Sequence, residues 1–596
     1  MAPARLSALE LLLWGAAAIA VAVLPSVLSI FSVVQITVFL IFCLLAVSLD
    51  LAWGLAGLLS FGQTAFFGIG GYVYAIIGVN GATTLASLAV AVGTAGVAAA
   101  ALGYVAFYGR LSAMFLAVMT LTVTLILLQV MGSTADPSYR IGAAALGGYN
   151  GMTNIPALAL DAPFVSAPAL GPVEFFWTVG GLLIGTVVLG RLLMIAPFGR
   201  VLVAIGENEQ RVELLGYDVR WRKLAIFSLS GAVAGLAGAL FASWGSFINP
   251  EVFSLAQSAQ VVIWVLVGGR GSLYGAIVGA LLVQALTQYL GSIGTAYTTL
   301  ALGSILVVFV LLLRRGLLPT IVRGVTARRA ATDGIRPRMT RAPPEPGRFG
   351  GASDGATNSA VLLETQRLTK DFGGVHAVAA VDFRLRRGEL RCLIGPNGAG
   401  KSTFFKMLTG QLRPTSGAIL FAGTDIAGKP QHRIARLGIG IKNQVPSVWD
   451  GLSVYEHFWI AAHHRIGARS ATALTDSLLA ELGLEPIARC AVGELSHGQR
   501  QWVEIGMVIA QDPKLILLDE PTAGMGADEV ERTVLLLRAI NARATLVVVE
   551  HDMQFIEMIA GTVTVLHQGR ILVEDTMDNV LTNSLVKEVY LGSGSA

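Results

Sequence analysis

The charged residues of this 596-residue chain are distributed very unevenly, and that distribution restricts its possible folds more than any other feature. From Leu51 to Gly109 there is no Asp, Glu, Lys or Arg, whereas charges occur at ordinary globular density after Leu362. Overall, 54% of the residues are hydrophobic and only 13% are charged, which is too apolar for an average soluble protein. The sequence therefore predicts a lipid-embedded first half and a water-exposed second half.

Nine apolar segments are long enough to cross a hydrocarbon layer of about 30 Å as helices. They cover residues 8–28, 31–52, 54–79, 83–107, 111–131, 175–195, 224–247, 257–290 and 297–313. The 257–290 segment is interrupted by "GGRGSLYG" and is either two short spans or a broken helix that lines a cavity. We therefore predict a transmembrane domain of about eight to ten spans over residues 1–323. The amino terminus imitates a signal peptide, but the spans that follow favour a first membrane anchor.

Basic residues in the loops predict the orientation, because cytoplasmic loops are enriched in Lys and Arg. The loop between the 175–195 and 224–247 spans contains Arg191, Arg200, Arg211, Arg220, Arg222 and Lys223. The loop over 132–173 contains Arg140 alone, so the first loop is predicted to be cytoplasmic and the second external. Arg314, Arg315 and Arg323 follow the last span on the inner side, which places everything after them in the cytoplasm.

Composition divides the rest of the chain and excludes some functions. Residues 324–360 are rich in Pro, Gly, Ala, Ser and Arg and predict a flexible linker before a soluble domain over 361–596. The net charge of +4 is small and forms no stripe for nucleic acid, and three cysteines have no metal spacing. "GLAG" occurs at 54–57 and 235–238 and indicates either close helix packing or an internal duplication.

The segment "LRCLIGPNGAGKST" matches a phosphate-binding loop between a strand and a helix. Its glycines let backbone N–H groups surround phosphates, and the following helix adds its positive end. Lys401 is expected to neutralise the β- and γ-phosphates, while Ser402 coordinates Mg²⁺. The nucleotide-binding residues predicted here are Gly395, Asn397, Gly398, Gly400, Lys401, Ser402 and Thr403.

Two further segments supply candidate catalytic groups. "LILLDEP" is an apolar strand that ends in Asp519, expected in the Mg²⁺ shell, and Glu520, expected to act as general base on the attacking water. "VVVEHD" places His551 just past another apolar strand, from which it reaches the γ-phosphate and the water.

With these motifs in order, residues 361–596 resemble the α/β P-loop nucleotide-binding domain of ATP-binding cassette (ABC) transporters. The resemblance implies that Phe372 stacks on adenine and that Gln444, in "IKNQVP", serves both Mg²⁺ and the reaction. It also identifies "LSHGQRQW" as the signature, whose Ser496, Gly498 and Gln499 contact nucleotide held by a second cassette. His497 stands where the commonest signature has glycine, and Gly526 stands where aspartate is common.

The first half is similar to permeases of the branched-chain and hydrophobic amino acid importers. The resemblance rests on "GLAGLLSFGQTAFFGIGGY", "GRVLVAIGENEQRVELLGYDVRWRKLAIFSLSGAVAGLAGAL" and "VLVGGRGSLYGAIVGA". It implies an inverted-repeat helical domain in the bacterial inner membrane, a second permease subunit, a second ABC ATPase subunit and a periplasmic or extracellular substrate-binding protein. Within the second stretch, Ala204–Gly216 predicts a short helix that docks onto the cassette or, alternatively, lies at the membrane interface.

The sequence leaves the transported substrate open. Branched-chain or other hydrophobic amino acids are the first hypothesis, and urea or short-chain amides are the second, because "LSHGQRQWVEIGM" and "GGYNGMTNIP" resemble the urea branch. Gln63, Thr64, Gln129, Gln257 and Gln260 are polar residues inside spans that either line the path or join helices. The scarcity of ionisable residues in the spans predicts transport driven by ATP hydrolysis rather than by protons.

Two other classes of protein fit the order of domains less well. An ABC exporter usually extends its spans into the cytoplasm with charged helices, and this sequence has none. An ATP-gated channel or regulator would need no external binding protein.

Overall fold

The structure is a computed structural model that describes residues 8–159, 168–292, 316–321 and 360–591, together with 303, 304, 307 and 311. The chain divides into two compact units: a helical unit of residues 2–206 and 220–335, and an α/β unit of residues 207–219 and 336–596. Arg314, Arg315, Arg323, most of the predicted 297–313 span and the predicted linker up to residue 359 lie outside the described residues.

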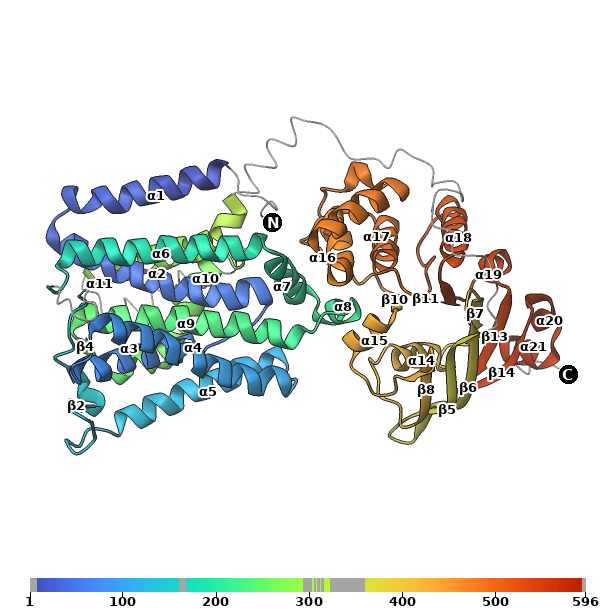
Figure 1. Cartoon of the computed structure of the whole chain (residues 1–596), viewed down its shortest axis with the longest axis horizontal. Helices are drawn as coiled ribbons and strands as arrows, with labels where there is room; N and C mark the ends of the chain where they lie inside the picture. The colour runs from blue at the N-terminus through green and yellow to red at the C-terminus, as the bar shows by residue number, and fades with distance from the viewer. Residues whose placement is uncertain are drawn as a thin grey trace. The chain divides into compact units, whose positions relative to one another are not determined.

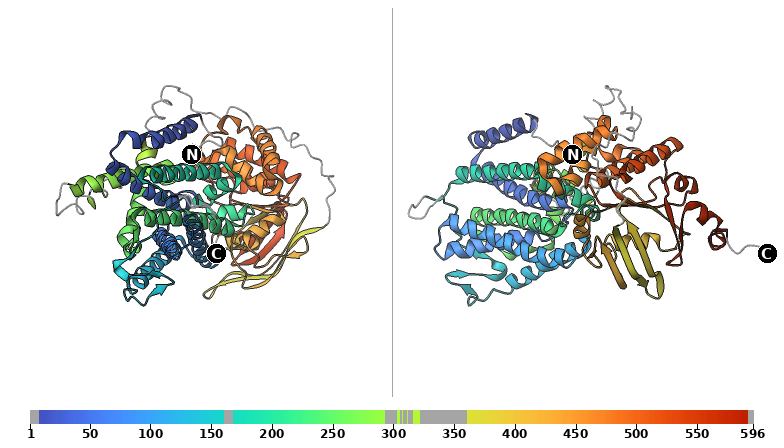
Figure 2. Two further views of the ribbon diagram at one scale, coloured as in Figure 1. Left: turned by 60° about the vertical axis from the view of Figure 1, so that its left-hand side comes forward. Right: turned by 45° about the vertical axis from the view of Figure 1, so that its right-hand side comes forward.

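The helical unit consists mainly of long apolar helices that lie alongside one another (Figure 2). They are α1 (Ala8–Val27), α2 (Ile30–Ala56), α3 (Gln63–Val79), α4 (Thr84–Tyr108), α5 (Ala113–Gly132), α6 (Pro172–Ile195), α7 (Pro197–Glu207), α9 (Val219–Gly245), α10 (Leu255–Gly268) and α11 (Leu273–Ser292). Seven of the described helices are long and apolar enough to cross a membrane, and α3 and α10 are shorter apolar helices. The chain is therefore a multi-pass membrane protein.

Short elements connect these helices. Strands β1 (Arg140–Ile141) and β2 (Ala144–Ala145) form a small hairpin, and a 3-10 turn, η1 (Gly148–Asn150), follows it. Strand β3 (Met152–Thr153) pairs antiparallel with β4 (Phe247–Ile248), and a second 3-10 turn, η2 (Pro250–Phe253), precedes α10. The pairing of β3 with β4 joins the predicted external loop to the end of α9.

Two of the predicted spans are interrupted by glycines in left-handed conformations. Gly57 ends α2 with φ 71°, so the helix expected over 54–79 begins only at Gln63. The sequence did not reveal this break because "GLLSFG" is as apolar as its flanks. The 257–290 segment forms two helices, and the break between them is held by the Gly271 N–H, which donates to Asp50 Oδ1 at 2.8 Å.

Small residues allow the helices of this unit to approach closely. A Cβ on Gly70 of α3 would collide with the Gly235 carbonyl, and one on Gly238 of α9 would collide with the Phe67 carbonyl. The second "GLAG" copy therefore has the packing role expected of small residues in lipid. An internal duplication and inverted-repeat symmetry stay predictions.

The α/β unit contains two sheets (Figure 1). The first is antiparallel, with strand order β6 (Val375–Arg386), β5 (Val361–Phe372), β8 (Ser416–Phe421) and β9 (Thr424–Asp425). The second has the order β10 (Ile439–Lys442), β11 (Leu515–Asp519), β12 (Thr545–Val549), β7 (Leu390–Ile394), β13 (Thr562–His567) and β14 (Arg570–Asp575). Its strands are parallel except for β14. The fully buried β7, β11 and β12 are mostly apolar, as parallel strands usually are, with Arg391 inside β7 and Asp519 at the end of β11 as exceptions.

Helices complete the α/β unit. They are α8 (Glu209–Leu214), α14 (Lys401–Leu408), α15 (Gln431–Leu437), α16 (Val454–Glu481), α17 (His497–Ala510), α18 (Ala527–Asn541), α19 (Met553–Ile559), α20 (Met577–Thr582) and α21 (Ser584–Leu591), with 3-10 turns η3 (Glu485–Ile487) and η4 (Val492–Glu494).

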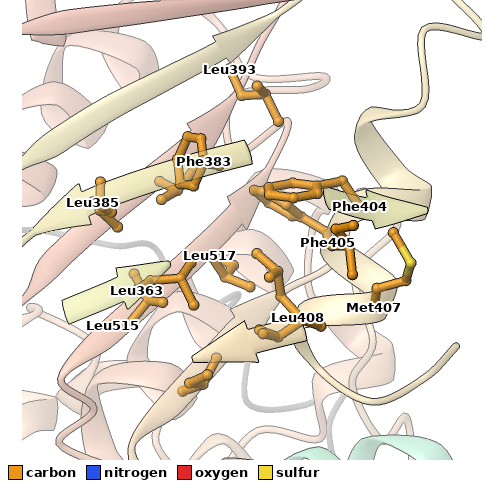
Figure 3. Close-up of a cluster of buried hydrophobic side chains, with 14 of the residues drawn as sticks. Leu363, Phe383, Leu385, Leu393, Phe404, Phe405, Met407, Leu408, Leu515 and Leu517 are labelled. Atoms are coloured by element: carbon orange, nitrogen blue, oxygen red, sulfur yellow. The ribbon is translucent and has the colours of Figure 1, made fainter. Parts of the chain in front are cut away.

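A hydrophobic core joins the two sheets through α14 (Figure 3). Phe383 of β6 meets Phe404 of α14 edge to face, with ring centroids 5.5 Å apart. Leu515 and Leu517 of β11 belong to the same cluster, and so does Leu214 of α8. This core fixes the position of the phosphate-loop helix relative to both sheets.

The strand order determines where the predicted site forms. Strands β11, β12 and β7 are neighbours and run parallel, so the loops after their carboxyl ends share one edge of the sheet. Those loops begin at Glu520, Glu550 and Gly395, and they carry most of the residues that the sequence assigned to ATP.

Candidate functional site

The phosphate loop follows β7 and leads directly into α14. Gly400 is the N-cap residue of α14 with φ 102°, and a Cβ at this position would collide with the Ala377 carbonyl oxygen. Asn397, Gly398 and Ser402 are exposed on the outer side of the loop. Lys401 Nζ donates to the carbonyls of Gly395 at 2.6 Å and Pro396 at 3.0 Å. The loop is therefore exposed at Asn397, Gly398 and Ser402, while the Lys401 ammonium lies against the loop's own carbonyl groups.

The three predicted catalytic residues meet at the carboxyl end of β11. Glu520 Oε2 accepts a hydrogen bond from Gln444 Nε2 at 2.9 Å, and Glu520 Oε1 lies 3.7 Å from His551 Nδ1. Glu520 itself has φ 45°, a left-handed conformation that is uncommon for a side chain of this size. Such backbone strain is found most often where a side chain must be held in one place for function.

Asp519 lies in an environment that favours a cation. Burial and the neighbouring Glu520 carboxylate raise the pKa of Asp519 to about 6, although Lys442 and Lys401 oppose this shift. A bound cation would relieve the repulsion between the two carboxylates. The donors predicted for it, Ser402, Gln444 and Asp519, all offer oxygen, the ligand that Mg²⁺ prefers.

No group of three His, Cys, Asp or Glu residues that could hold a metal occurs in the described part of the chain. Mg²⁺ usually takes one or two carboxylates and obtains its other ligands from water and phosphate. The residues at the end of β11 therefore fit Mg²⁺ bound together with nucleotide.

Sequence reasoning missed two buried charged residues beside this site. Lys442 is fully buried, and its Nζ donates to the carbonyls of Asp519 at 3.2 Å and Glu520 at 3.0 Å. Burial lowers the pKa of Lys442 to about 8. Glu550 accepts from Thr522 Oγ1 at 2.6 Å and from the His551 N–H at 3.2 Å. A charged residue inside the apolar run "GIGIK" was the signal for Lys442, and the letter before His551 was the signal for Glu550.

The signature residues form the amino terminus of α17. Ser496 Oγ accepts from the Gln499 N–H at 3.3 Å, and Gln499 Oε1 accepts from the Ser496 N–H at 3.0 Å, which is a capping box. His497 Nε2 lies 3.3 Å from Gln501 Nε2, and a Cβ on Gly524 would be only 3.0 Å from the His497 ring. The histidine therefore packs against the turn after Glu520 and leaves the cap of α17 intact.

Phe372, predicted to stack on adenine, is partly exposed. It ends β5 with 46% of its surface exposed, and Lys370 Nζ lies 5.1 Å from the centre of its ring. A half-exposed aromatic face is available for stacking.

Residues 207–219, here called the docked segment, lie between α7 and α9 in sequence but belong to the α/β unit. Asn208 Nδ2 donates to Ser447 Oγ at 3.0 Å, Tyr217 Oη donates to the Ile460 carbonyl at 2.7 Å, and Arg436 Nε donates to the Gly216 carbonyl at 2.8 Å. These contacts favour docking onto the cassette over the alternative of a helix at the membrane interface. The single helix expected over 204–216 was wrong, because Asn208, with φ −152°, ends α7 and caps α8.

Two of the five polar residues predicted inside the spans, Gln63 and Thr64, form hydrogen bonds within the helical unit. Gln129 is exposed. Ser48 Oγ donates to Gln63 Oε1 at 3.1 Å, and Gln63 Nε2 donates to Ser230 Oγ at 3.0 Å. Thr64 Oγ1 and Ser258 Oγ are 2.6 Å apart. These bonds connect helices that are distant in sequence, which supports a packing role for Gln63 and Thr64.

Two family profiles match the chain. The family described as "Branched-chain amino acid transport system / permease component" matches residues 13–313. The family described as "ABC transporter" matches residues 378–523. The permease match spans the described transmembrane helices, and the second match includes the phosphate loop, Gln444, the signature and Glu520.

Curated relatives match the α/β unit. The high-affinity branched-chain amino acid transport ATP-binding protein BraF of Pseudomonas aeruginosa is 31% identical over 249 residues, which are 39% of this chain and 98% of BraF. LivG of Escherichia coli, with the same described role, is also 31% identical over 249 residues, with the same coverage. The lipopolysaccharide export system ATP-binding protein LptB of Acidithiobacillus ferridurans is 33% identical over 233 residues, 39% of this chain and 97% of LptB.

A solved structure of a nucleotide-free ATP-binding cassette from an ABC transporter is also similar to the α/β unit. It is 26% identical, covers 39% of this chain and 100% of its own, and has a TM-score of 0.36.

Proposed function

The chain belongs to the branched-chain amino acid transport permease family, and we propose that it imports branched-chain or other hydrophobic amino acids as a fused permease and ATPase subunit. Its permease domain and its ABC ATPase domain lie in one multi-pass membrane protein, the ATPase domain is cytoplasmic, and ATP hydrolysis is coupled to transport. The observation that carries the substrate class is the permease match over residues 13–313. The relatives of the ATPase domain do not decide it, because they include both BraF and LptB.

We propose roles for the residues at the edge of the sheet from their geometry. Glu520 acts as the general base, because its carboxylate is held by Gln444 and lies beside His551. Ser402, Gln444 and Asp519 hold Mg²⁺, which supplies charge neutralisation at the phosphates, and Lys401 adds a second positive charge. His551 orients the water and the γ-phosphate. Phe372 stacks on adenine, and the backbone of the phosphate loop binds the phosphates.

The signature is proposed to act on nucleotide bound by another cassette. Ser496, Gly498 and Gln499 lie at the positive end of α17, which suits a γ-phosphate. The functional complex therefore contains a second permease, a second ABC ATPase and an external substrate-binding protein. Membrane lipid surrounds the helical unit.

The test is a ligand screen on the binding protein that operates with this chain. Its thermal stability is measured with leucine, valine, urea and acetamide, because bound ligand raises the midpoint of unfolding. A shift with leucine or valine and none with urea or acetamide supports the proposal. A shift with urea or acetamide alone assigns the chain to the second substrate class.

A further inference from the structure

Arg211 of the docked segment is completely enclosed by the α/β unit. Its side chain and that of Glu504 on α17 both have 0% exposure, and Arg211 Nη1 lies 3.3 Å from Glu504 Oε1. The same Nη1 donates to the Ile441 carbonyl of β10 at 2.8 Å. In the sequence, Arg211 lies between α7 and α9 of the helical unit. Its side chain is nevertheless part of the interior of the α/β unit.

Glu504 brings the signature helix to this arginine. It lies on α17, the helix that begins with the signature, about two turns after the cap residue Ser496. Glu504 Oε1 also accepts from the Asn443 N–H at 3.4 Å. The signature helix and the segment after β10 therefore converge on one carboxylate.

The four residues from 441 to 444 extend this contact to the catalytic turn. The Ile441 carbonyl accepts from Arg211, and the Asn443 N–H donates to Glu504. Lys442 holds the backbone carbonyls of Asp519 and Glu520, and Gln444 holds the Glu520 carboxylate. Residues 441 and 443 thus contact the buried ion pair, while residues 442 and 444 contact Asp519 and the proposed general base, Glu520.

Buried apolar residues also attach the docked segment to the α/β unit, so attachment by itself does not require the charges of this pair. Val212 and Leu214 of α8 are buried as well, and Leu214 belongs to the hydrophobic core of the α/β unit. A guanidinium remains charged in a protein, and a buried charge is tolerated only when it is paired. In the described part of the chain, Arg211 Nε, Arg211 Nη2 and Glu504 Oε2 have no hydrogen-bond partner. The charge of Glu504 is balanced by Arg211 and by the buried Lys442 ammonium.

We propose that Arg211 and Glu504 form an electrostatic lock by which the docked segment positions the signature helix and the Gln444–Glu520 contact for hydrolysis. Both are positioning residues, since neither touches the phosphate loop or the proposed general base directly. The lock goes beyond the proposed import of amino acids, because it does not depend on which solute is carried.

Docking is measured first, with the full-length chain in membranes. Gln210 and Gln411 share an exposed hydrogen bond of 2.8 Å, so Gln210→Cys and Gln411→Cys are joined by a short bis-maleimide in a Cys490→Ser background. Proteolysis between residues 324 and 359 then releases two fragments unless the crosslink holds them together. We expect Arg211→Met and Glu504→Gln to lower the crosslinked fraction at least fivefold, because each leaves a buried charge unpaired.

The double variant separates positioning from folding. Arg211→Met with Glu504→Gln removes both charges of the pair, and Lys442 keeps Asp519, Glu550 and Glu520 as neighbouring carboxylates, so we expect at least half of the parental crosslinking and a parental KM for ATP. Its kcat for ATP hydrolysis, measured on the assembly purified from membranes, should nevertheless fall at least tenfold. Arg211→Lys alone should retain more of the kcat than Arg211→Met does. Arg465→Met, which removes an exposed ion pair with Asp512, is the matched control and should change nothing.

Two results would overturn the lock. One is parental crosslinking in both single variants, which would show that either charge is tolerated there without its partner and that the two charges are not coupled. The other is a parental kcat in the double variant, which would show that the pair is only structural. Neither measurement requires a transported solute, so failure of the lock is distinguishable from failure of the proposed substrate.

Discussion

The buried polar groups of the two units differ in kind. In the helical unit, Ser48, Gln63 and Ser230 are neutral, and each has a partner on another helix or on its own backbone. The α/β unit buries neutral groups such as Thr365 and Thr533 as well, but it also buries charged residues around the proposed catalytic turn, namely Arg211, Lys442, Glu504, Asp519 and Glu550. Arg391 of β7 is buried apart from these, with Glu389 and Glu574. Neutral hydrogen bonds join helices in lipid, whereas buried charges are costly and are usually retained where they serve a function.

The helical unit contains exceptions to this contrast. Arg191 of α6 pairs with Glu10 of α1 at 2.6 Å, and Asp50 of α2 holds the break between α10 and α11. These groups fix helix ends and a break. The comparison predicts that changing neutral groups in the helical unit costs little, while changing charges in the α/β unit affects turnover or its pH dependence.

The largest effect is expected for Glu520→Gln. Loss of the general base should lower ATP hydrolysis by about 10²–10⁴-fold, while ATP binding is retained because the phosphate loop is unchanged. Hydrolysis is measured with the assembled transporter, and binding is measured with a fluorescent ATP analogue. Glu557→Gln, an exposed carboxylate on α19, is the control and should hydrolyse ATP normally. Undiminished hydrolysis by Glu520→Gln would remove Glu520 from the reaction.

The next effect concerns acid stability and depends on His457. Its Nε2 accepts from the Trp449 N–H at 2.9 Å, so Nδ1 carries the proton donated to the Ser453 carbonyl at 2.7 Å. Burial lowers the pKa of His457 to about 4, below the value of about 6.5 for an unfolded chain. Its contribution to stability is therefore complete above about pH 6.5 and is lost as the pH falls toward 4. The loss amounts to about 3 kcal/mol.

Thermal unfolding of the α/β unit between pH 7 and pH 4 measures this dependence. His457→Gln removes the titrating ring and should flatten the dependence. His376→Gln, at an exposed histidine, should leave it as it is. An unchanged slope in His457→Gln would assign acid sensitivity to other groups.

A smaller effect is expected for Lys442→Met on the pH profile of kcat/KM for ATP. The Lys442 ammonium lowers the pKa of Asp519, so its removal should shift the acid limb of the profile to higher pH. Activity then falls at a higher pH as the medium is acidified. Lys514→Met, at an exposed lysine before β11, should keep the parental profile. A downward shift in Lys442→Met would contradict the assigned charge interaction.

The smallest effect is expected for Gln63→Leu in the helical unit. Ser48 still donates to the Leu45 carbonyl and Ser230 still donates to the Ser48 carbonyl, so no hydroxyl is left without an acceptor. We expect the free energy of unfolding to fall by less than about 1 kcal/mol. Gly238→Leu should instead abolish folding, because its side chain would collide with the Phe67 carbonyl. Loss of transport in a stable Gln63→Leu protein would place Gln63 on the substrate path.

Much of the fold was predictable because the decisive signals are local. Apolar runs located the membrane helices, and short motifs after apolar strands located Lys401, Asp519 and Glu520. Because neighbouring strands run parallel, the loops after them lie at one edge of the sheet, so a sequence that predicts the strands also predicts this edge.

What the sequence did not reveal depends on contacts between distant residues. From the sequence, Arg211 was identified only as one of several basic residues that orient a loop. No residue near it in the sequence indicates a contact with Glu504, which lies nearly three hundred residues later. Lys442 lies in a short strand whose neighbour β11 appears only in the folded sheet. The break at Asn208 was missed because "GENEQR" has no Gly or Pro after Gly206, and both halves favour a helix.

The docked segment also has a consequence for how the protein is made. A ribosome synthesises residues 207–219 before any part of the domain whose core they complete, since Leu214 joins a cluster that otherwise begins at Leu362. The nascent ATPase domain therefore folds around a segment that is already present and anchored by its neighbouring helices. Fusion in one chain keeps the local concentration of that segment high, so each newly made domain meets its own permease loop before it can meet a loop from another chain.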